Sequence, residues 1–172
     1  GDRVVPVLNQ YAERFAAARH PVFASRDWHP RVTRHFQAQG GPWPPHCVAQ
    51  TPGAAFHPAL KLPAETSVLT KGTHPQDDGY SAFEAVDGAG RSLHDVLRQD
   101  DVATLFVGGL ATEYCVRASV MDGLKHGLDV VVLLDAVRGI DVQAGDVARA
   151  LDEMLRAGAR TATLATIDQE LR

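Results

Sequence analysis

The chain has 172 residues, of which 45% are hydrophobic and 22% are charged, and its formal net charge is −4 at pH 7. Its basic residues form no block of like charge, and no apolar run approaches the ~20 residues that span a bilayer, so neither nucleic acid nor a membrane is an expected partner. A chain of this length is expected to fold as a single domain, residues 1–172, and to act on a small molecule. No signal-peptide pattern is visible, so we expect a cytoplasmic protein with free Cys47 and Cys115.

The predicted elements alternate between helices and strands. An apolar spacing of three and four residues predicts an opening helix at residues 4–15. Strands are predicted at 21–26, from 68 onward, at 102–107, at 128–134 and, more weakly, at 161–165. Further helices are predicted at 92–98, 112–126 and 142–156. Because parallel neighbours need a crossover connection, this alternation predicts an α/β fold with a doubly wound, mostly parallel sheet flanked by helices.

One long connection interrupts the pattern. Residues 29–62 contain six prolines, and such long connections are usually functional or disordered. Asp27 and His29 precede it at the carboxyl end of a predicted strand, where side chains two residues apart point the same way. His35 and His46 follow within the connection. One carboxylate and three imidazoles suit Zn²⁺ or Fe²⁺, with Mn²⁺ a further candidate, better than Mg²⁺ or Ca²⁺.

A cysteine lies in the first turn of a predicted helix. Gly108 and Gly109 end the strand at 102–107, and Thr112 is a natural N-cap, so Cys115 falls where helix N–H groups lower a thiol pKa. A small buried packing residue is the alternative role for Cys115. Lys71 follows another predicted strand and would reach the same sheet edge, although lysine is more often solvated. We expect Cys47 to be a packing residue.

Six strings in this order carry a family resemblance, and together they span essentially the whole chain. They are Arg26-Asp27-Trp28-His29, Trp43-Pro44-Pro45-His46-Cys47-Val48, Thr51-Pro52-Gly53-Ala54 with Phe56-His57-Pro58, Lys71-Gly72, Gly79-Tyr80-Ser81-Ala82-Phe83-Glu84, and Gly109-Leu110-Ala111-Thr112-Glu113-Tyr114-Cys115-Val116. The chain resembles the nicotinamidase/pyrazinamidase group of the isochorismatase-like cysteine hydrolase superfamily. This resemblance implies the hydrolysis of nicotinamide, or of a related amide such as pyrazinamide, within NAD salvage and pyridine nucleotide biosynthesis.

The resemblance also implies roles for individual residues. It implies that the metal ligands are Asp27, His29, His35 and His46, and that the metal orients the pyridine ring. Cys115 would be the nucleophile and Lys71 the catalytic lysine. The N–H groups of Ala111 and Cys115 would receive the oxyanion after a cis peptide at Leu110-Ala111. The substrate-binding residues would be Trp43, Tyr80 and Leu110.

One expected part of the family pattern has no counterpart in the sequence. The proton-transferring Asp of the family ends its first strand, in a segment of the type Asp-x-Gln-x-Asp-Phe, and Asp2, Asp77 and Asp78 do not match that segment. We therefore expect that roughly 20 to 25 N-terminal residues, including an internal strand, are missing from this chain. The remaining chain should then have unpaired strand edges, low stability and little activity.

Three alternatives stay open at this point. The chain could be another isochorismatase-like hydrolase, although those relatives lack this histidine set. It could be a water-activating zinc hydrolase in which Cys115 is structural. It could also be a non-catalytic metal-binding or pyridine-binding relative if the catalytic Asp is naturally absent. The sequence leaves the oligomeric state open, a homo-oligomer included.

Overall fold

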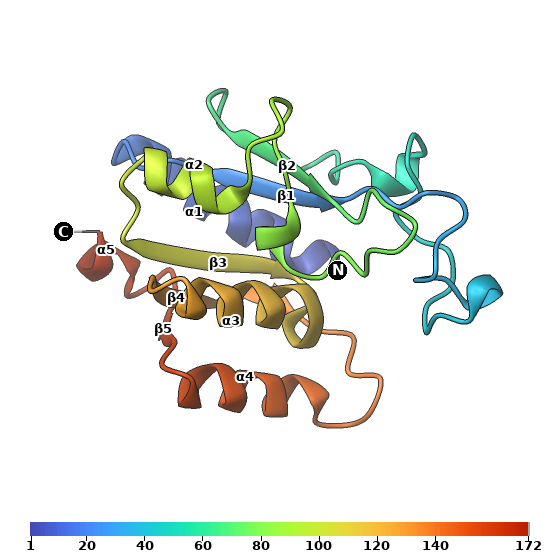
Figure 1. Cartoon of the computed structure of the whole chain (residues 1–172). Coiled ribbons are helices and arrows are strands. Elements are labelled where there is room, and N and C mark those ends of the chain that lie inside the picture. Colours follow the sequence, from blue (N-terminus) through green and yellow to red (C-terminus); the bar gives the residue numbers. More distant parts are fainter. Residues whose placement is uncertain (172) are drawn as a thin grey trace.

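The computed structural model describes residues 1–171, and every pairing between its five strands is parallel (Figure 1). The strands are β1 Phe23–Asp27, β2 Ser67–Lys71, β3 Thr104–Leu110, β4 Asp129–Arg138 and β5 Arg160–Ala162. They form two sheets, one of order β1-β2 and one of order β3-β4-β5. The predicted parallel α/β class is confirmed, and the strands are divided between two sheets.

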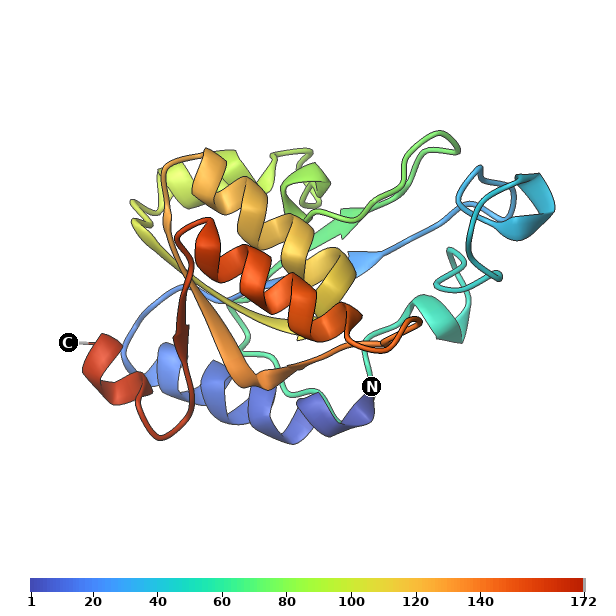
Figure 2. The same cartoon turned by 90° about the horizontal axis from the view of Figure 1, so that it is seen from below.

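Helices cover both faces of these sheets. They are α1 Val5–Ala17, α2 Leu93–Gln99, α3 Arg117–Lys125, α4 Asp146–Arg156 and α5 Ile167–Glu170. Figure 2 shows α3 and α4 on one side of the larger sheet and α1 on the other. This is the layering of a doubly wound fold. Within the described residues, no helix has both the length and the apolar content needed to cross a membrane.

The core is built around β4, the middle strand of the larger sheet. Val130 and Val132 pack with α3 and α4, where Val120 and Met154 are fully buried. Val131 and Leu133 point to the opposite face and pack with α1 and α5. A strand that is buried on both faces has a continuous run of apolar residues. For this reason residues 128–134 could be predicted as a strand from the sequence.

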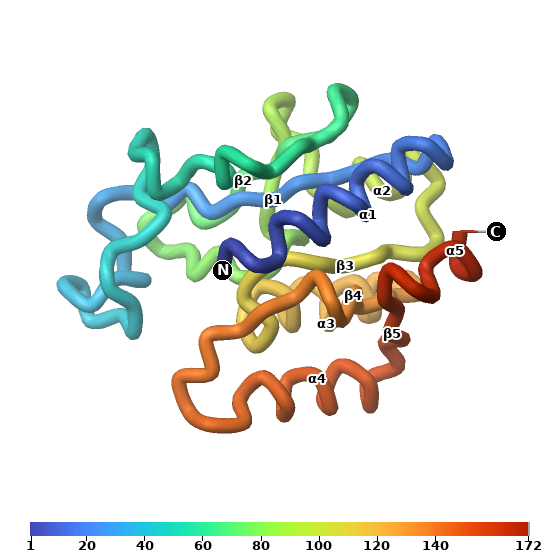
Figure 3. Tube along the Cα trace, turned by 180° about the vertical axis from the view of Figure 1, so that it is seen from behind, coloured from blue at the N-terminus to red at the C-terminus, as the bar shows by residue number. Residues whose placement is uncertain are grey.

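The edges of the two sheets that face each other are unpaired. Among the described residues, β1 pairs only with β2, and β3 pairs only with β4. A cavity of about 810 Å³ lies between β1 and β3, and α1 contributes to its lining. Figure 3 shows α1 along this side of the molecule, between β1 and β3 in the view. Asp27 and Cys115 also border the cavity.

Several boundaries differ from the predictions for tertiary reasons. β3 continues through both glycines, because Gly109 pairs with Val137 of β4 after a local register shift. α4 begins at Asp146 instead of residue 142, because Gly145 precedes it in a left-handed conformation with φ +89°. β5 is only three residues long, and the short helix α5 was not predicted.

Candidate active site

Three strand ends meet at one edge of the molecule. Asp27 is the last residue of β1, and its register partner Lys71 is the last residue of β2. Cys115 follows the end of β3 by five residues. Open parallel sheets place ligand sites at the carboxyl ends of their strands. The fold therefore brings the predicted thiol, lysine and carboxylate together from three separate strands.

Lys71 connects the thiol to a carboxylate. Its side chain is buried, and its Nζ donates hydrogen bonds to Asp27 Oδ1 and to the carbonyl oxygen of Gly79. The same Nζ lies 3.4 Å from Cys115 Sγ. The solvated role that is usual for lysine is thus excluded for Lys71. A buried ammonium between a thiol and a carboxylate is suited to holding and moving a proton.

Burial and charge act in opposite directions on the pKa values of this pair. Burial raises the pKa of the Cys115 thiol, while the ammonium of Lys71 and a hydrogen bond from the Ala111 N–H act to lower it. Burial acts to lower the pKa of Lys71, but the charges of Cys115 and Asp27 outweigh this effect and raise it. The expectation of a depressed thiol pKa is therefore wrong for the structure as it stands, because desolvation exceeds the charge effects.

The turn that carries Cys115 begins with the expected cis peptide at Leu110-Ala111. The N-cap is Ala111 in an extended conformation, not Thr112 as predicted, and no side chain caps the turn. Thr112 is instead buried inside the first turn, where its Oγ1 has no hydrogen-bond partner. The Val116 N–H bonds to the Ala111 carbonyl at 3.1 Å, which gives a wide π-type turn at residues 112–116. We call residues 110–116 the thiol elbow.

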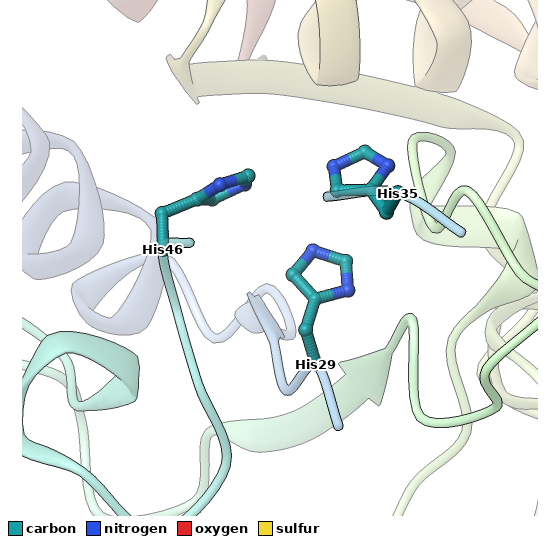
Figure 4. A group of neighbouring side chains, drawn as sticks. All are labelled: His29, His35 and His46. Carbon is teal, nitrogen blue, oxygen red and sulfur yellow. The ribbon is translucent and has the colours of Figure 1, made fainter. Parts of the chain in front are cut away.

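Three histidines converge beside the thiol. Ligand atoms of His29, His35 and His46 all lie within 4.8 Å of one another, and Figure 4 shows the three rings pointing toward a common space. His29 Nδ1 lies 3.2 Å from the carbonyl oxygen of Gly72, and His46 Nδ1 lies 2.9 Å from that of Pro44. Such bonds orient imidazole rings for metal binding. This is the one metal-ligating group of three or more found in the chain up to residue 171.

The donor set fits a divalent metal. His35 Nδ1 is buried without a hydrogen-bond partner among residues 1–171, which leaves a lone pair free to bind a cation. Burial lowers the pKa of His29 and lowers that of His35 to about 4, so both rings are neutral near pH 7. Neutral imidazole is the form that binds metal. Imidazole nitrogens favour Zn²⁺ or another first-row ion over Mg²⁺ or Ca²⁺.

A glycine is required behind this cluster. Gly72 has φ +64°, and a Cβ at this position would lie 2.6 Å from His29 Cε1. Only glycine combines this left-handed conformation with such a close approach. The Lys71-Gly72 string is therefore explained by two needs at adjacent positions: an ammonium for the thiol and space for the His29 ring.

Asp27 takes an unexpected place beside this cluster, whereas Cys47 does not. The carboxylate of Asp27 pairs with Lys71, and Asp27 is not part of the histidine group, so its role as a metal ligand stays a prediction. Cys47 is a half-buried free thiol, and burial raises its pKa to about 11, which fits the predicted packing role.

Aromatic side chains connect the histidines to the elbow. Trp43 Nε1 donates to Tyr80 Oη at 2.8 Å, and the ring centroid of His35 lies 5.5 Å from that of Tyr80. Tyr114 completes this wall, with ring centroids 4.8 Å from Trp43 and 6.0 Å from Tyr80. Tyr114 was missed in the sequence, although an aromatic residue directly before the cysteine was a visible signal. Leu110 is 47% exposed at the start of the elbow.

Known proteins share this sequence and architecture. A family model described as "Isochorismatase domain" matches residues 1–169. Nicotinamidase from Escherichia coli (strain K12) is 39% identical over 183 residues, which cover 96% of this chain and 85% of the relative. Nicotinamidase/pyrazinamidase from Mycobacterium tuberculosis (strain ATCC 25618 / H37Rv) is 42% identical over 142 residues, which cover 81% of this chain and 74% of the relative.

A solved structure is also similar to this chain. The crystal structure of pyrazinamidase of Pyrococcus horikoshii in complex with zinc has a TM-score of 0.86 and 41% identity to this chain. The match covers 95% of this chain and 86% of the other. Because the family model covers nearly the whole chain and relatives well above 30% identity match most of it, the chain belongs to the isochorismatase family.

Proposed function

We propose that the protein is an amidohydrolase of the nicotinamidase/pyrazinamidase type, which converts nicotinamide to nicotinate and ammonia. The single observation that carries this proposal is the 3.4 Å contact between Lys71 Nζ and Cys115 Sγ. A nucleophile next to a proton-holding group is the signature of covalent catalysis. The relatives that are nicotinamidases support the choice of substrate, and pyrazinamide is a second substrate of the same shape.

The histidine cluster would hold one divalent metal. His29, His35 and His46 would be its ligands, and Asp27, whose Oδ1 pairs with Lys71, would be a fourth through its other carboxylate oxygen. Zn²⁺ is our first choice, with Fe²⁺ and Mn²⁺ as alternatives, and the zinc complex of the Pyrococcus horikoshii pyrazinamidase supports a metal here. When bound, the ion would supply a Lewis-acid contact for the pyridine nitrogen of the substrate.

The residues of the chain would then have separate roles in binding and catalysis. Trp43, Tyr80 and Leu110 would bind the ring and direct its carboxamide toward the elbow. The Cys115 thiolate would attack the carboxamide carbon while Lys71 holds the proton that the leaving nitrogen receives. The N–H groups of Ala111 and Cys115 would receive the oxyanion, ammonia would leave, and water would hydrolyse the thioester to nicotinate.

The carboxylate of the proton relay is the incomplete part of this site. Among the described residues, Asp27 is the carboxylate that contacts Lys71, whereas Asp78 pairs with Arg34 at 3.0 Å on the surface. The sequence segment that carries the relay Asp in the family is not present in this chain. We therefore expect slow hydrolysis of nicotinamide by this chain. We place the activity in NAD salvage, in the cytoplasm, and leave a homo-oligomer as an expectation.

The deciding experiment measures ammonia release from nicotinamide. It compares residues 1–172 with the Cys115→Ala variant, each loaded with Zn²⁺. Turnover that disappears in Cys115→Ala supports the cysteine amidase. Turnover that survives in Cys115→Ala but requires the metal would replace it with a water-activating zinc hydrolase. Binding of nicotinamide without turnover would instead indicate a binding relative.

A further inference from the structure

Glu113 ties the thiol elbow to a separate loop. It lies between Ala111 and Cys115, and its Oε1 accepts hydrogen bonds from the N–H groups of Ile140 at 2.8 Å and Asp141 at 2.7 Å. Ile140 and Asp141 belong to the connection between β4 and α4. Two N–H donors on one carboxylate oxygen form strong, charge-assisted hydrogen bonds. One side chain of the elbow therefore anchors two consecutive residues of another segment.

The anchored loop is otherwise weakly held. Ile140 is 56% exposed and Val142 is 64% exposed. Asp141 has φ +57°, a conformation that non-glycine residues adopt only when their surroundings hold them in place. Further side-chain hydrogen bonds join this loop to α4: the Val147 N–H donates to Asp141 Oδ1 at 3.2 Å, the Gln143 N–H donates to Asp146 Oδ2 at 2.8 Å, and Arg149 Nη1 donates to the carbonyl oxygen of Ala144 at 3.4 Å.

The packing around Glu113 is also fitted to its carboxylate. A Cβ at Gly139 would lie 2.4 Å from Glu113 Oε2, so only glycine at this position lets the carboxylate lie against the loop. Oε2 is itself buried and has no hydrogen-bond partner in the described part of the chain. The hydrogen bonds of Glu113 join the elbow to the loop backbone, so its effect on the site is mechanical.

We propose that Glu113 is a positioning residue for the oxyanion groups of the elbow. By anchoring the loop at Ile140 and Asp141, it fixes the turn at 112–116 and with it the N–H groups of Ala111 and Cys115. This inference rests on the proposed function, in which those N–H groups receive the oxyanion. A displacement of about 1 Å in such groups can cost on the order of 100-fold in rate.

The test uses an aldehyde that reports on the oxyanion groups without turnover. Pyridine-3-carbaldehyde adds reversibly to a thiol: a new S–C bond forms, the carbonyl π bond breaks, and the thiol proton ends on the oxygen. The adduct oxygen would occupy the oxyanion position. Adduct affinity, kcat and KM for nicotinamide, and the pH midpoint of Cys115 alkylation by iodoacetamide are measured in the Zn²⁺-loaded protein.

Two substitutions of Glu113 and one control are compared. Glu113→Ala should weaken the adduct and lower kcat by about 10- to 100-fold, with KM and the alkylation midpoint unchanged. Glu113→Gln should recover most of the loss, because its amide oxygen can accept the same two hydrogen bonds. Asp146→Ala loosens the same loop at Gln143 without touching the elbow, and it should stay within about twofold of the parent protein.

Other outcomes would overturn the inference or separate it from the proposed function. An equal loss in Asp146→Ala would show that general loop order matters and not the Glu113 anchor. A shifted alkylation midpoint in Glu113→Gln would indicate an electrostatic role. If the parent protein forms no adduct, the assignment of the Ala111 and Cys115 N–H groups as the oxyanion site is rejected. If the variants show the expected adduct affinities but nicotinamide is not hydrolysed, the positioning role of Glu113 is supported and nicotinamide is rejected as the substrate.

Discussion

The two sheets of this molecule differ in how firmly they are built. In the larger sheet, β4 is paired on both edges, and Val130, Val131 and Val132 are almost fully buried. The smaller sheet has only β1 and β2, each five residues long, and Val68 of β2 is 36% exposed. Two strands alone are only marginally stable in water.

The difference matters because the site uses both sheets. The larger sheet carries the thiol elbow, whereas the smaller sheet carries Lys71, Asp27 and the start of the histidine connection. The nucleophile is therefore held by the better-supported half, and the groups that tune and orient it belong to the weaker half. Changes in the two halves should have different consequences.

The largest effect is expected from the nucleophile on the larger sheet. Cys115→Ala should reduce ammonia release from nicotinamide by at least about 1,000-fold, because loss of a covalent nucleophile removes the reaction path. The Cys47→Ala variant removes the other free thiol and should keep most of the activity. Equal losses in both variants would contradict the assignment of Cys115.

The next effect concerns the histidines that follow the smaller sheet. His35→Ala should weaken Zn²⁺ binding by more than about 100-fold, because outer-shell changes alone can cost 10- to 100-fold at metal sites. Titration calorimetry with Zn²⁺ measures this directly. His94→Ala, which lies on α2 outside the cluster, should bind Zn²⁺ like the parent protein. Unchanged affinity in His35→Ala would remove His35 from the ligand set.

Stability should distinguish the sheets as well. Val132→Ala in β4 should lower the free energy of unfolding by about 2 kcal/mol, since it deletes two buried methyl groups and leaves a cavity. Val68→Ala in β2 should cost less than about 0.5 kcal/mol, because that side chain is partly exposed. Urea denaturation of both variants tests the contrast, and similar losses would show that the sheets are equally supported.

The smallest effect concerns the contact that joins the sheets. The ammonium of Lys71 acts to lower the thiol pKa of Cys115, so Lys71→Met should raise that pKa further. The pH midpoint of iodoacetamide alkylation should move upward, and alkylation at pH 8 should slow by about tenfold for each unit of the shift. A midpoint that moves downward would show that Lys71 does not stabilise the thiolate.

The elements that could be predicted from sequence are those set by local pattern. The apolar run at 128–134 and the helical spacing at 4–15 each carry enough signal alone, and β4 and α1 are found there. The histidine cluster was also predictable, because Asp27-x-His29 ends a strand and His46 follows two prolines. Parallel strand ends then placed Lys71 and Cys115 at the same edge.

What could not be predicted depends on partners distant in sequence. Pairing with Val137 extends β3 through Gly109, a residue that locally reads as a strand end. The pairing of Asp27 with Lys71, and not with the histidines, follows from strand register. The net direction of the Cys115 pKa shift depends on burial, which no local pattern reveals.

The cavity between β1 and β3 has a consequence for how the protein loses activity on heating. Because no strand pairing within residues 1–171 crosses it, the smaller sheet can open as a separate unit at a lower free energy than the larger one. Such an opening would carry Lys71 away from Cys115 while β3, β4 and β5 stay folded. Inactivation should then precede the main unfolding transition, and amides of β2 should exchange with deuterium sooner than those of β4.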